Sequence, residues 1–256
     1  MRIASWNVNS LRVRLGQVLA WLEARRPDVL GLQETKVTDD SFPEEEIANA
    51  GYRAVWHGQK TYNGVALLTR ADARDVVRGL EDYPDEQRRV VGATVAGIRV
   101  YNVYAPNGQS VGSDKYTYKL EWFDALRSQL ARELTEHRRL LVMGDFNVAP
   151  EDRDVHDPDA WIGNVLVSPD ERAALAGIAG LGLADTFRLF EQPEASFSWW
   201  DYRAAAFRRN RGLRIDLQLA SEALARNCRC AAIDREPRGW ERPSDHAPVY
   251  ADFEAG

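Results

Sequence analysis

An acidic and an amide side chain stand two residues apart in the stretch 140–150, which reads LLVMGDFNVAP. The apolar run has the length of a buried strand, and Pro150 prevents the strand from continuing. Residues two apart on an extended segment point the same way, so Asp145 and Asn147 would leave the strand end side by side. Such a pair could act on a bound substrate, or it could only satisfy the backbone of a tight turn.

Polar side chains also stand at or near the ends of several other predicted strands. These side chains are Asn7 in residues 2–8, Glu34 after 28–32, Tyr104 at the end of 98–104, Asp216 within 213–220 and His246 before the final strand. Taken singly, a residue such as Glu34 is explained well enough as a solvated charge at a strand end. Together they predict that the function lies where these strand ends converge.

Apolar residues at helical spacing predict the helices that connect these strands. The first helix begins after Ser10, a residue suited to cap a helix, and stops at Arg26-Pro27. Further helices are expected at residues 43–50, at 114–137 and from Ser168-Pro169 onward. The remaining strands are expected near residues 52–56, 64–69 and 90–95, with Ala96-Gly97 as the hairpin turn into 98–104.

No linker or low-complexity tract divides the 256 residues, so we expect a single domain over residues 1–256. Several short strands and two long amphipathic helices predict an α/β fold, in which two packed mixed β-sheets are flanked by helices. Each half of the chain begins with an apolar strand that ends in polar residues, so the two halves are expected to be built alike.

The composition is that of a folded globular protein. Apolar residues make up 45% and charged residues 28%, and no run approaches the roughly 18 apolar residues of a membrane span. The chain enters a strand directly from Met1-Arg2 without a signal-peptide pattern, so we expect a cytoplasmic protein with no membrane partner. Cys228 and Cys230 lie two apart on an expected strand, where a disulfide would be strained, and are expected to stay reduced.

The net charge of −6 argues against nucleic-acid binding through bulk positive charge. The net charge does not exclude a local basic patch, because the arginines are distributed unevenly along the chain. The densest cluster consists of Arg203, Arg208, Arg209, Arg211 and Arg214. Such a run is ordinarily a solvated face, and only a neighbouring functional site would favour phosphate contacts.

Seven segments together resemble, in order and spacing, the exonuclease III family of abasic-site endonucleases. They read WNVNSLR, LQETK, YNVYAPNG, GDFNVAP, SFSWWDYR, NRGLRIDLQLAS and PSDHAPV. The resemblance spans residues 3–252, and the motifs WWDYR and NRGLRID are similar to the bacterial DNA-repair branch. It implies a DNase I-like four-layered α/β sandwich, a Mg²⁺ or Mn²⁺ ion, and hydrolysis of DNA phosphodiesters.

The same resemblance implies a metal site. Glu34 matches the family's metal ligand, Asn7 would orient the ligand shell, and Asp245 would assist the metal or the leaving group. Mg²⁺ prefers oxygen ligands and is usually held by only one or two carboxylates. Some relatives carry an aspartate where this chain has Asn9, and because an amide offers no charge we expect one ion rather than two.

Five catalytic roles follow from the resemblance. Asp145 would orient and deprotonate the attacking water, and Asn147 would hold the phosphate or the aspartate. His246 would contact the scissile phosphate while Asp216 accepts its other ring N–H. Tyr104 would hydrogen-bond the phosphate. The sequence leaves open whether Asp145 or His246 is the general base.

Substrate contacts are implied in three places. Trp199 matches the wall of a small pocket for a flipped-out sugar without a base, with Leu213 and Ile215 as its other apolar walls; ordinary core packing is the alternative for Trp199 and the preferred explanation for Trp200. The basic cluster would then contact DNA phosphates, chiefly through Arg203, Arg208 and Arg211. A second loop gripping the backbone would consist of Gln109, Lys115, Tyr116 and Lys119.

The resulting hypothesis is a divalent-metal-dependent DNA-repair nuclease that cuts 5′ to abasic sites and trims 3′ ends. Its partner would be double-stranded DNA with abasic sites or 3′ ends, bound by a monomer. A phosphoesterase of the same fold acting on a lipid or inositol phosphate is the first alternative. A binding module without catalysis is the second, and the apparently complete residue set argues against it.

Overall fold

The computed structural model describes residues 1–254, which form two six-stranded sheets. In spatial order the first sheet contains β11 (Cys228–Ile233), β12 (Val249–Phe253), β1 (Arg2–Asn7), β2 (Val29–Gln33), β4 (Val65–Thr69) and β3 (Arg53–His57). The second contains β5 (Ala73–Arg78), β6 (Val90–Val95), β7 (Ile98–Tyr104), β8 (Leu140–Asp145), β10 (Asp216–Ser221) and β9 (Leu183–Asp185).

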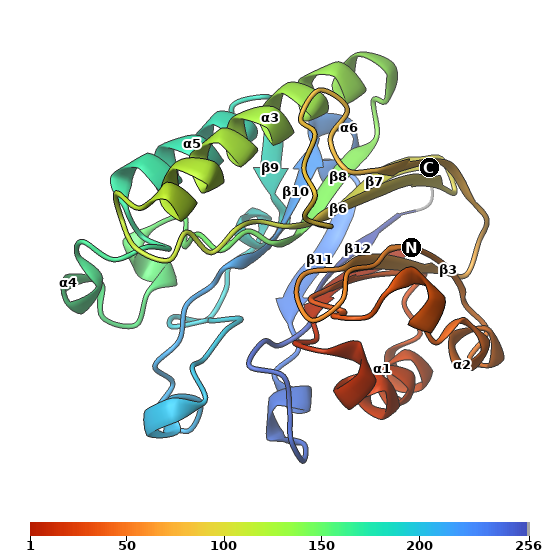
Figure 1. The fold of residues 1–256 in the computed structure, drawn as a ribbon, viewed down its shortest axis with the longest axis horizontal. Helices are drawn as coiled ribbons and strands as arrows, with labels where there is room; N and C mark the ends of the chain where they lie inside the picture. Colours follow the sequence, from red (N-terminus) through yellow and green to blue (C-terminus); the bar gives the residue numbers. More distant parts are fainter. Residues whose placement is uncertain (255–256) are drawn as a thin grey trace.

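The helices are α1 (Leu11–Arg25), α2 (Glu44–Asn49), α3 (Asp114–Glu136), α4 (Pro158–Trp161), α5 (Pro169–Ala179) and α6 (Glu222–Ala225). Four of them cover the outer faces of the sheets. The helices α1 and α2 lie against the first sheet, and α3 and α5 lie against the second, with the two sheets face to face between them (Figure 1). The predicted four-layered α/β sandwich is therefore confirmed.

Three apolar clusters hold the layers together. Trp6 of β1 and Trp21 of α1 pack in the outer cluster of the first sheet, with ring centroids 6.1 Å apart. Phe123 of α3 belongs to the outer cluster of the second sheet. Ile3 and Val100 belong to the cluster between the sheets. Because burying one such side chain contributes about 1.5–3 kcal/mol, these clusters make a firm base for the loops at the sheet edges.

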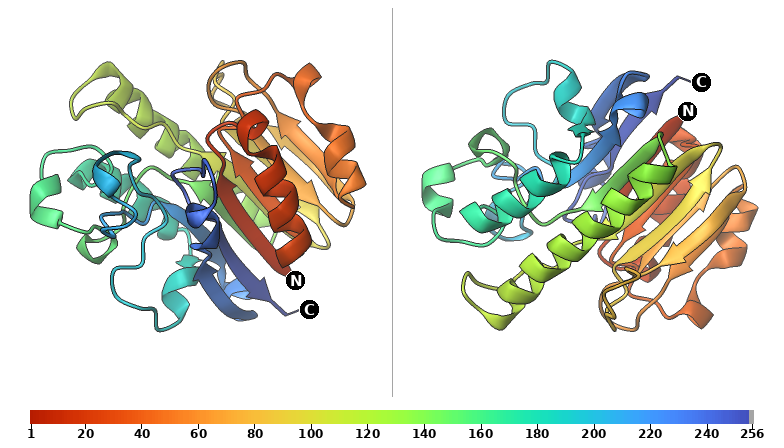
Figure 2. Two further views of the ribbon diagram at one scale, coloured as in Figure 1. Left: turned by 90° about the horizontal axis from the view of Figure 1, so that it is seen from below. Right: turned by 90° about the horizontal axis from the view of Figure 1, so that it is seen from above.

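The two sheets share one plan. In the first, β1 and β2 run parallel and are joined by α1, and in the second, β7 and β8 run parallel and are joined by α3. Figure 2 shows these two crossover helices on opposite faces of the molecule. Strands β12 and β10 run antiparallel to β1 and β8. The carboxyl ends of four strands and the amino ends of two others therefore meet at one edge of the sandwich.

Most predicted elements are confirmed to within a few residues, and the exceptions have physical causes. The strand β5 escaped prediction because its side chains are largely exposed and do not alternate, and β9 is only three residues long. The strand expected at 213–220 begins only at Asp216, since Leu213 instead forms isolated bridges. Ser10 precedes α1 as expected, but its φ is 90° and its side chain makes no capping hydrogen bond.

Cys228 and Cys230 are free thiols, as expected from their spacing. Within residues 1–254, none of the helices combines the length and apolar character needed to span a bilayer.

Candidate active site

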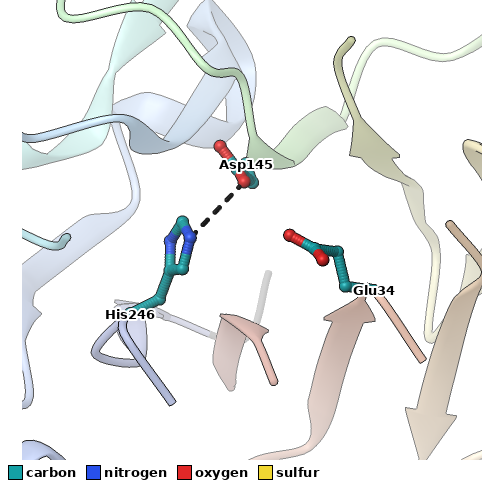
Figure 3. Close-up of side chains that lie close together, drawn as sticks. All are labelled: Glu34, Asp145 and His246. Carbon is teal, nitrogen blue, oxygen red and sulfur yellow. Dashed lines mark ion pairs between the residues drawn. The ribbon is translucent and has the colours of Figure 1, made fainter. Parts of the chain in front are cut away.

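Four strand ends bring the first group of candidate residues together. Asn7 ends β1, Tyr104 ends β7 and Asp145 ends β8, while Glu34 directly follows β2. The Asn7 side-chain Nδ2 donates to Glu34 Oε1 at 2.8 Å and to Asp145 Oδ2 at 2.9 Å. A single amide therefore ties a carboxylate beside the first sheet to one from the second, and both carboxylates face His246 across the gap (Figure 3).

The turn after β8 explains why its sequence reads GDFN. Gly144 has φ 147°, and a Cβ built there would overlap the carbonyl oxygen of Val103, so only glycine lets β8 approach β7 at this point. Asn147 has φ 50°, a left-handed conformation that asparagine tolerates better than most residues. Its backbone N–H donates to Asp145 Oδ1 at 2.9 Å. The structure therefore contains the tight turn that the sequence suggested, and this turn leaves Asp145 Oδ2 directed into the site.

His246 and Asp216 form a buried pair opposite Asp145. His246 Nδ1–H donates to Asp216 Oδ2 at 2.9 Å, and His246 Nε2 lies 3.7 Å from Asp145 Oδ2. The strand register places Asp216 directly across from Asp145 on the neighbouring strand β10. Ser198, which sequence reasoning missed, donates its hydroxyl to Asp216 Oδ2 at 2.6 Å and accepts the Asp216 backbone N–H at 3.1 Å. Only its place in the SFSWW stretch pointed to it.

Burial and neighbouring charges set the protonation states of His246 and Asp145. Burial lowers the pKa of His246, but the carboxylates around it, Asp216 foremost, outweigh burial and raise that pKa to about 10. Burial raises the pKa of Asp145 to about 7, although the imidazolium of His246 opposes the rise. His246 is therefore a cation at neutral pH, whereas Asp145 exchanges its proton near neutrality.

Asp216→Asn should change how the stability of the metal-free protein depends on pH. A histidine with a raised pKa in the folded state contributes stability that is complete below its unfolded pKa of about 6.5 and is lost as the pH rises through the folded value of about 10. Without the Asp216 charge this contribution shrinks. The variant's deficit in unfolding free energy is expected to be largest near pH 6 and to narrow toward pH 10.

Urea denaturation in EDTA at several pH values measures this deficit. Asp124→Asn is the matched control, because Asp124 is an exposed helix residue paired only with Arg127. A deficit for Asp216→Asn that stays constant over the whole range would contradict the linkage.

Tyr104 and Asp245 flank the central group. Burial, together with the charges of Glu34 and Asp145, raises the pKa of Tyr104 well above 10, so its hydroxyl stays protonated and can donate a hydrogen bond. The Asp245 carboxylate accepts from Trp199 Nε1 and from Asn9 Nδ2, each at 3.0 Å. Burial raises the pKa of Asp245, but the His246 charge and these two bonds lower it overall.

One polar side-chain atom each from Glu34, Asp145 and His246 lies within 4.8 Å of the other two. A protonated His246 has no lone pair to offer a metal ion, so the available ligands in this group are the two carboxylates. The two carboxylates fit a hard divalent ion such as Mg²⁺ or Mn²⁺. Asn7 presents its NH₂ group here, because its oxygen accepts the Asn9 backbone N–H at 3.0 Å, which suits the predicted orienting role. Asp245 is not in this group of three, so its part in metal binding stays a prediction.

Lys36 is a second residue that the sequence reasoning did not single out. Its ammonium lies 2.9 Å from Glu34 Oε2 and donates to Asn9 Oδ1 at 2.6 Å. The cation compensates the Glu34 charge on the side away from Asn7. Its place in the LQETK motif, two residues after Glu34, was the available signal.

An apolar cluster adjoins His246 through Trp199. Trp199 forms isolated bridges with Leu213 and His246, and its ring meets that of Trp161 edge to face at 6.5 Å. Leu213 and Ile215 belong to the same cluster but are almost completely buried. The partly exposed apolar surface therefore comes from Trp199, Trp161, Val165 and Val167. Trp200 is fully buried against Phe207, so the core-packing explanation preferred for it is confirmed.

The predicted basic residues are divided between surface and interior. Arg203, Arg208 and Arg211 are exposed in the segment that follows Trp199, and Arg203 pairs with Asp201. Arg214 of the same cluster is buried and paired with Asp154 and Asp185. Gln109 and Lys115 are exposed and line a groove of about 770 Å³ next to Tyr104.

Two members of the predicted backbone-gripping loop must be corrected. The Lys119 side chain has no exposed surface and forms an ion pair with Glu171, so it does not reach a ligand at the surface. The Tyr116 ring is buried and its hydroxyl hydrogen-bonds Ser168 Oγ at 2.7 Å. Both lie on α3 where α5, its N-cap Ser168 and the turn after β8 cover the helix, whereas Lys115 in the first turn of the same helix faces solvent.

Comparisons with known proteins agree with this geometry. Residues 4–246 match the endonuclease/exonuclease/phosphatase family. The chain is 40% identical to the exodeoxyribonuclease III of Haemophilus influenzae, over 99% of this chain and 100% of the relative. Its structure is similar to that of the 3′ phosphatase NExo from Neisseria bound to product DNA hairpin (TM-score 0.98, 46% identity, 100% of both chains). It is also similar to an AP endonuclease from Archaeoglobus fulgidus (TM-score 0.97, 40% identity, 100% of both chains). The chain therefore belongs to the exonuclease III branch of the endonuclease/exonuclease/phosphatase family.

Proposed function

We propose that this protein is a divalent-metal-dependent DNA-repair nuclease that hydrolyses phosphodiesters 5′ to abasic sites and trims 3′ ends of duplex DNA. The observation that carries the proposal is the approach of Glu34, Asp145 and His246 to within 4.8 Å at one edge of the sandwich. The names of the relatives support the substrate class, since they describe an exodeoxyribonuclease, an AP endonuclease and a 3′ phosphatase bound to a DNA hairpin.

Asp145 is the general base in this proposal. A base works best when its pKa lies near the operating pH, and burial brings the pKa of Asp145 to about 7. His246 is a poor candidate, because its pKa of about 10 leaves it protonated under the same conditions. The Asn147 backbone and the Asn7 amide hold the two Asp145 oxygens, so the carboxylate is oriented before a water arrives.

The remaining polar groups act on the phosphate. The His246 imidazolium, held by Asp216, offers a positive charge and a donor at Nε2. Tyr104 offers a hydroxyl donor that stays protonated, and Asn147 offers its amide. Preorganised donors of this kind stabilise charge that develops on phosphate oxygens in the transition state. Every residue in this scheme comes from one chain, so the proposed reaction requires no residue from a second copy.

Glu34 would hold a single Mg²⁺ or Mn²⁺ ion, with Asn7 fixing the carboxylate and Asp145 nearby. When bound, the ion supplies positive charge that neutralises the nonbridging phosphate oxygens and the departing alkoxide. The choice of one ion rests on Asn9, which supplies an amide to Asp245 and accepts a hydrogen bond from Lys36.

Recognition of a lesion is assigned to the apolar cluster. Trp199, with Leu213 and Ile215 behind it, offers a surface suited to a sugar that has lost its base. The exposed arginines Arg203, Arg208 and Arg211, together with Gln109 and Lys115, would contact DNA phosphates on either side. Such local contacts reconcile DNA binding with the net charge of −6.

The test is incubation of the pure protein with a duplex that carries one abasic analogue. The expected result is Mg²⁺-dependent incision 5′ of the lesion, abolished by EDTA, and slower removal of nucleotides from the 3′ end of an intact duplex. A phosphatidylinositol phosphate and a soluble inositol phosphate serve as comparison substrates. Faster turnover of either one than of the abasic duplex would replace the proposal with the phosphoesterase alternative.

A further inference from the structure

A buried ammonium group lies directly behind the catalytic turn. Lys119 Nζ donates to the backbone oxygen of Asn147 at 2.7 Å and to that of Asn107 at 3.1 Å. The first oxygen belongs to the turn that orients Asp145, and the second belongs to the loop that follows Tyr104. One cation thus joins the loops after β8 and β7 from beneath.

Glu171 of α5 completes this group from the other side. It forms an ion pair with Lys119, and neither side chain has any exposed surface. Its Oε1 also accepts the Leu166 backbone N–H at 3.0 Å, and its Oε2 accepts the Ser168 backbone N–H at 3.1 Å. Ser168 is the N-cap of α5 and also bonds Tyr116 of α3. The pair therefore links α3, α5 and the segment just before α5.

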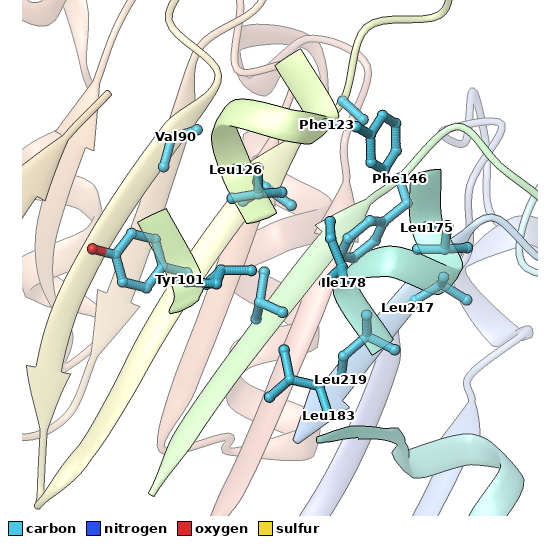
Figure 4. Packing of buried hydrophobic residues seen from close by; sticks show 14 of the residues in the cluster. Val90, Tyr101, Phe123, Leu126, Phe146, Leu175, Ile178, Leu183, Leu217 and Leu219 are labelled. Atoms are coloured by element: carbon cyan, nitrogen blue, oxygen red, sulfur yellow. The ribbon is translucent and has the colours of Figure 1, made fainter. Parts of the chain in front are cut away.

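The Lys119–Glu171 pair lies where it can hold the catalytic turn in place relative to α3 and α5. The helices α3 and α5 pack side by side over the second sheet, where Phe123, Phe146 and Leu175 share one apolar cluster (Figure 4). Phe146 stands between Asp145 and Asn147 and anchors the turn on this cluster. The backbone oxygens of Asn147 and Asn107 face away from the site, toward α3, where Lys119 is the donor that meets them.

A buried ion pair is weak evidence for a purely stabilising role. Desolvation of two charges often cancels their attraction, and replacing such a pair with uncharged residues of similar volume is often neutral for stability. Its position beneath the turn that carries Asp145 and Asn147 suggests another reason for it. The two carbonyl oxygens that Lys119 binds supply one, because the first belongs to the turn that orients Asp145 and the second to the loop that follows Tyr104.

We propose that the Lys119–Glu171 pair is a positioning device for the reaction, which holds the backbone of Asn147 and thereby the side chains of Asn147 and Asp145 in their catalytic arrangement. This inference rests on the proposed function of the site. Lys119 touches no substrate in this scheme and acts through the turn. The segment before α5 contributes Val165 and Leu166 to the apolar cluster around Trp199, so the same pair also connects that cluster to the turn.

The key variant is the double substitution Lys119→Met/Glu171→Gln, which removes both charges and leaves neither one unpaired. A displacement of about 1 Å in a catalytic group can cost on the order of 100-fold in rate. The expected result is a 10- to 100-fold fall in kcat on the abasic duplex, as an order of magnitude, with KM changed by less than about threefold. Arg127→Met is the matched control on the same helix, since Arg127 is exposed and pairs only with Asp124.

Stability and activity are separated by measuring kcat well below the melting temperature of each variant. A double variant that is folded under these conditions and keeps kcat within about twofold of the wild type would overturn the proposal. So would a variant whose lost activity is explained entirely by its unfolded fraction. The single variant Lys119→Arg provides the rescue arm, since it keeps a donor and a charge and should recover part of kcat.

Crystal structures of the wild type and of the double variant give a readout independent of substrate. The expected difference is a shift of Asn147 out of its left-handed conformation or away from Asp145, and an unchanged turn would count against the inference. If the wild type fails to cut the abasic duplex, the proposed function fails, whereas the conformation of the turn still tests the role of Lys119.

Discussion

Asp145→Asn is expected to lower kcat on an abasic duplex by about 10²- to 10⁴-fold, the range lost when a general base is removed. The substitution keeps the size of the side chain, but an amide cannot accept the proton of the attacking water. It also places an NH₂ group against either the Asn147 backbone N–H or the Asn7 amide, both of which are donors. Substrate binding relies on other residues, so KM should change little.

Steady-state kinetics with the abasic duplex measures this effect. Asp124→Asn, the same chemical change on an exposed helix position, should leave kcat as it is. The assignment of the base is wrong if Asp145→Asn retains turnover within about tenfold of the wild type. A rise in KM with unchanged kcat would instead assign Asp145 to substrate binding.

His246→Ala is expected to lower kcat by about 10²- to 10³-fold, comparable to the loss of one strong electrostatic contact to a developing negative charge. The variant removes both the positive charge and the Nε2 donor that face Asp145. It also leaves Asp216 buried without its partner, so stability must be measured alongside activity.

A double-mutant cycle with Asp216→Asn separates the roles of the two residues. If Asp216 acts only through His246, then adding Asp216→Asn to His246→Ala should lower kcat by no more than about threefold, because residues that act as a unit are strongly non-additive. Asp216→Asn alone should cost less than His246→Ala, since the ring remains. A further large loss in the double variant would give Asp216 an independent role.

The strand ends were predictable because they depend on local patterns. An apolar run ended by proline predicts where β8 stops, and a spacing of two predicts that Asp145 and Asn147 leave it together. The motif order then predicted the four-layered sandwich and the pairing of His246 with Asp216, which the structure contains at 2.9 Å. The two explanations offered for GDFN turned out to be compatible, because the tight turn itself orients the carboxylate.

Local sequence patterns could not predict which of the candidate side chains are buried. Lys115 and Lys119 stand four residues apart on one helix, yet the first is exposed and the second is enclosed by α5 and the catalytic turn. Because both side chains are positively charged, both were predicted to contact DNA. Likewise, Leu213 and Ile215 lie beside Trp199 as predicted, but only the packed structure shows that Trp161, Val165 and Val167 share the partly exposed part of that surface with Trp199.

The sequence by itself determined the family, the fold and the identity of the polar residues at the strand ends, because each of these depends on residue type and order along the chain. The tertiary structure alone decided which of those residues have shifted pKa values and which charged side chains form buried ion pairs. The reason is physical: a pKa and an ion pair depend on distances between segments as far apart as β2, β8 and the loop before β12. Such distances are set by how the two sheets pack, and no local pattern records them.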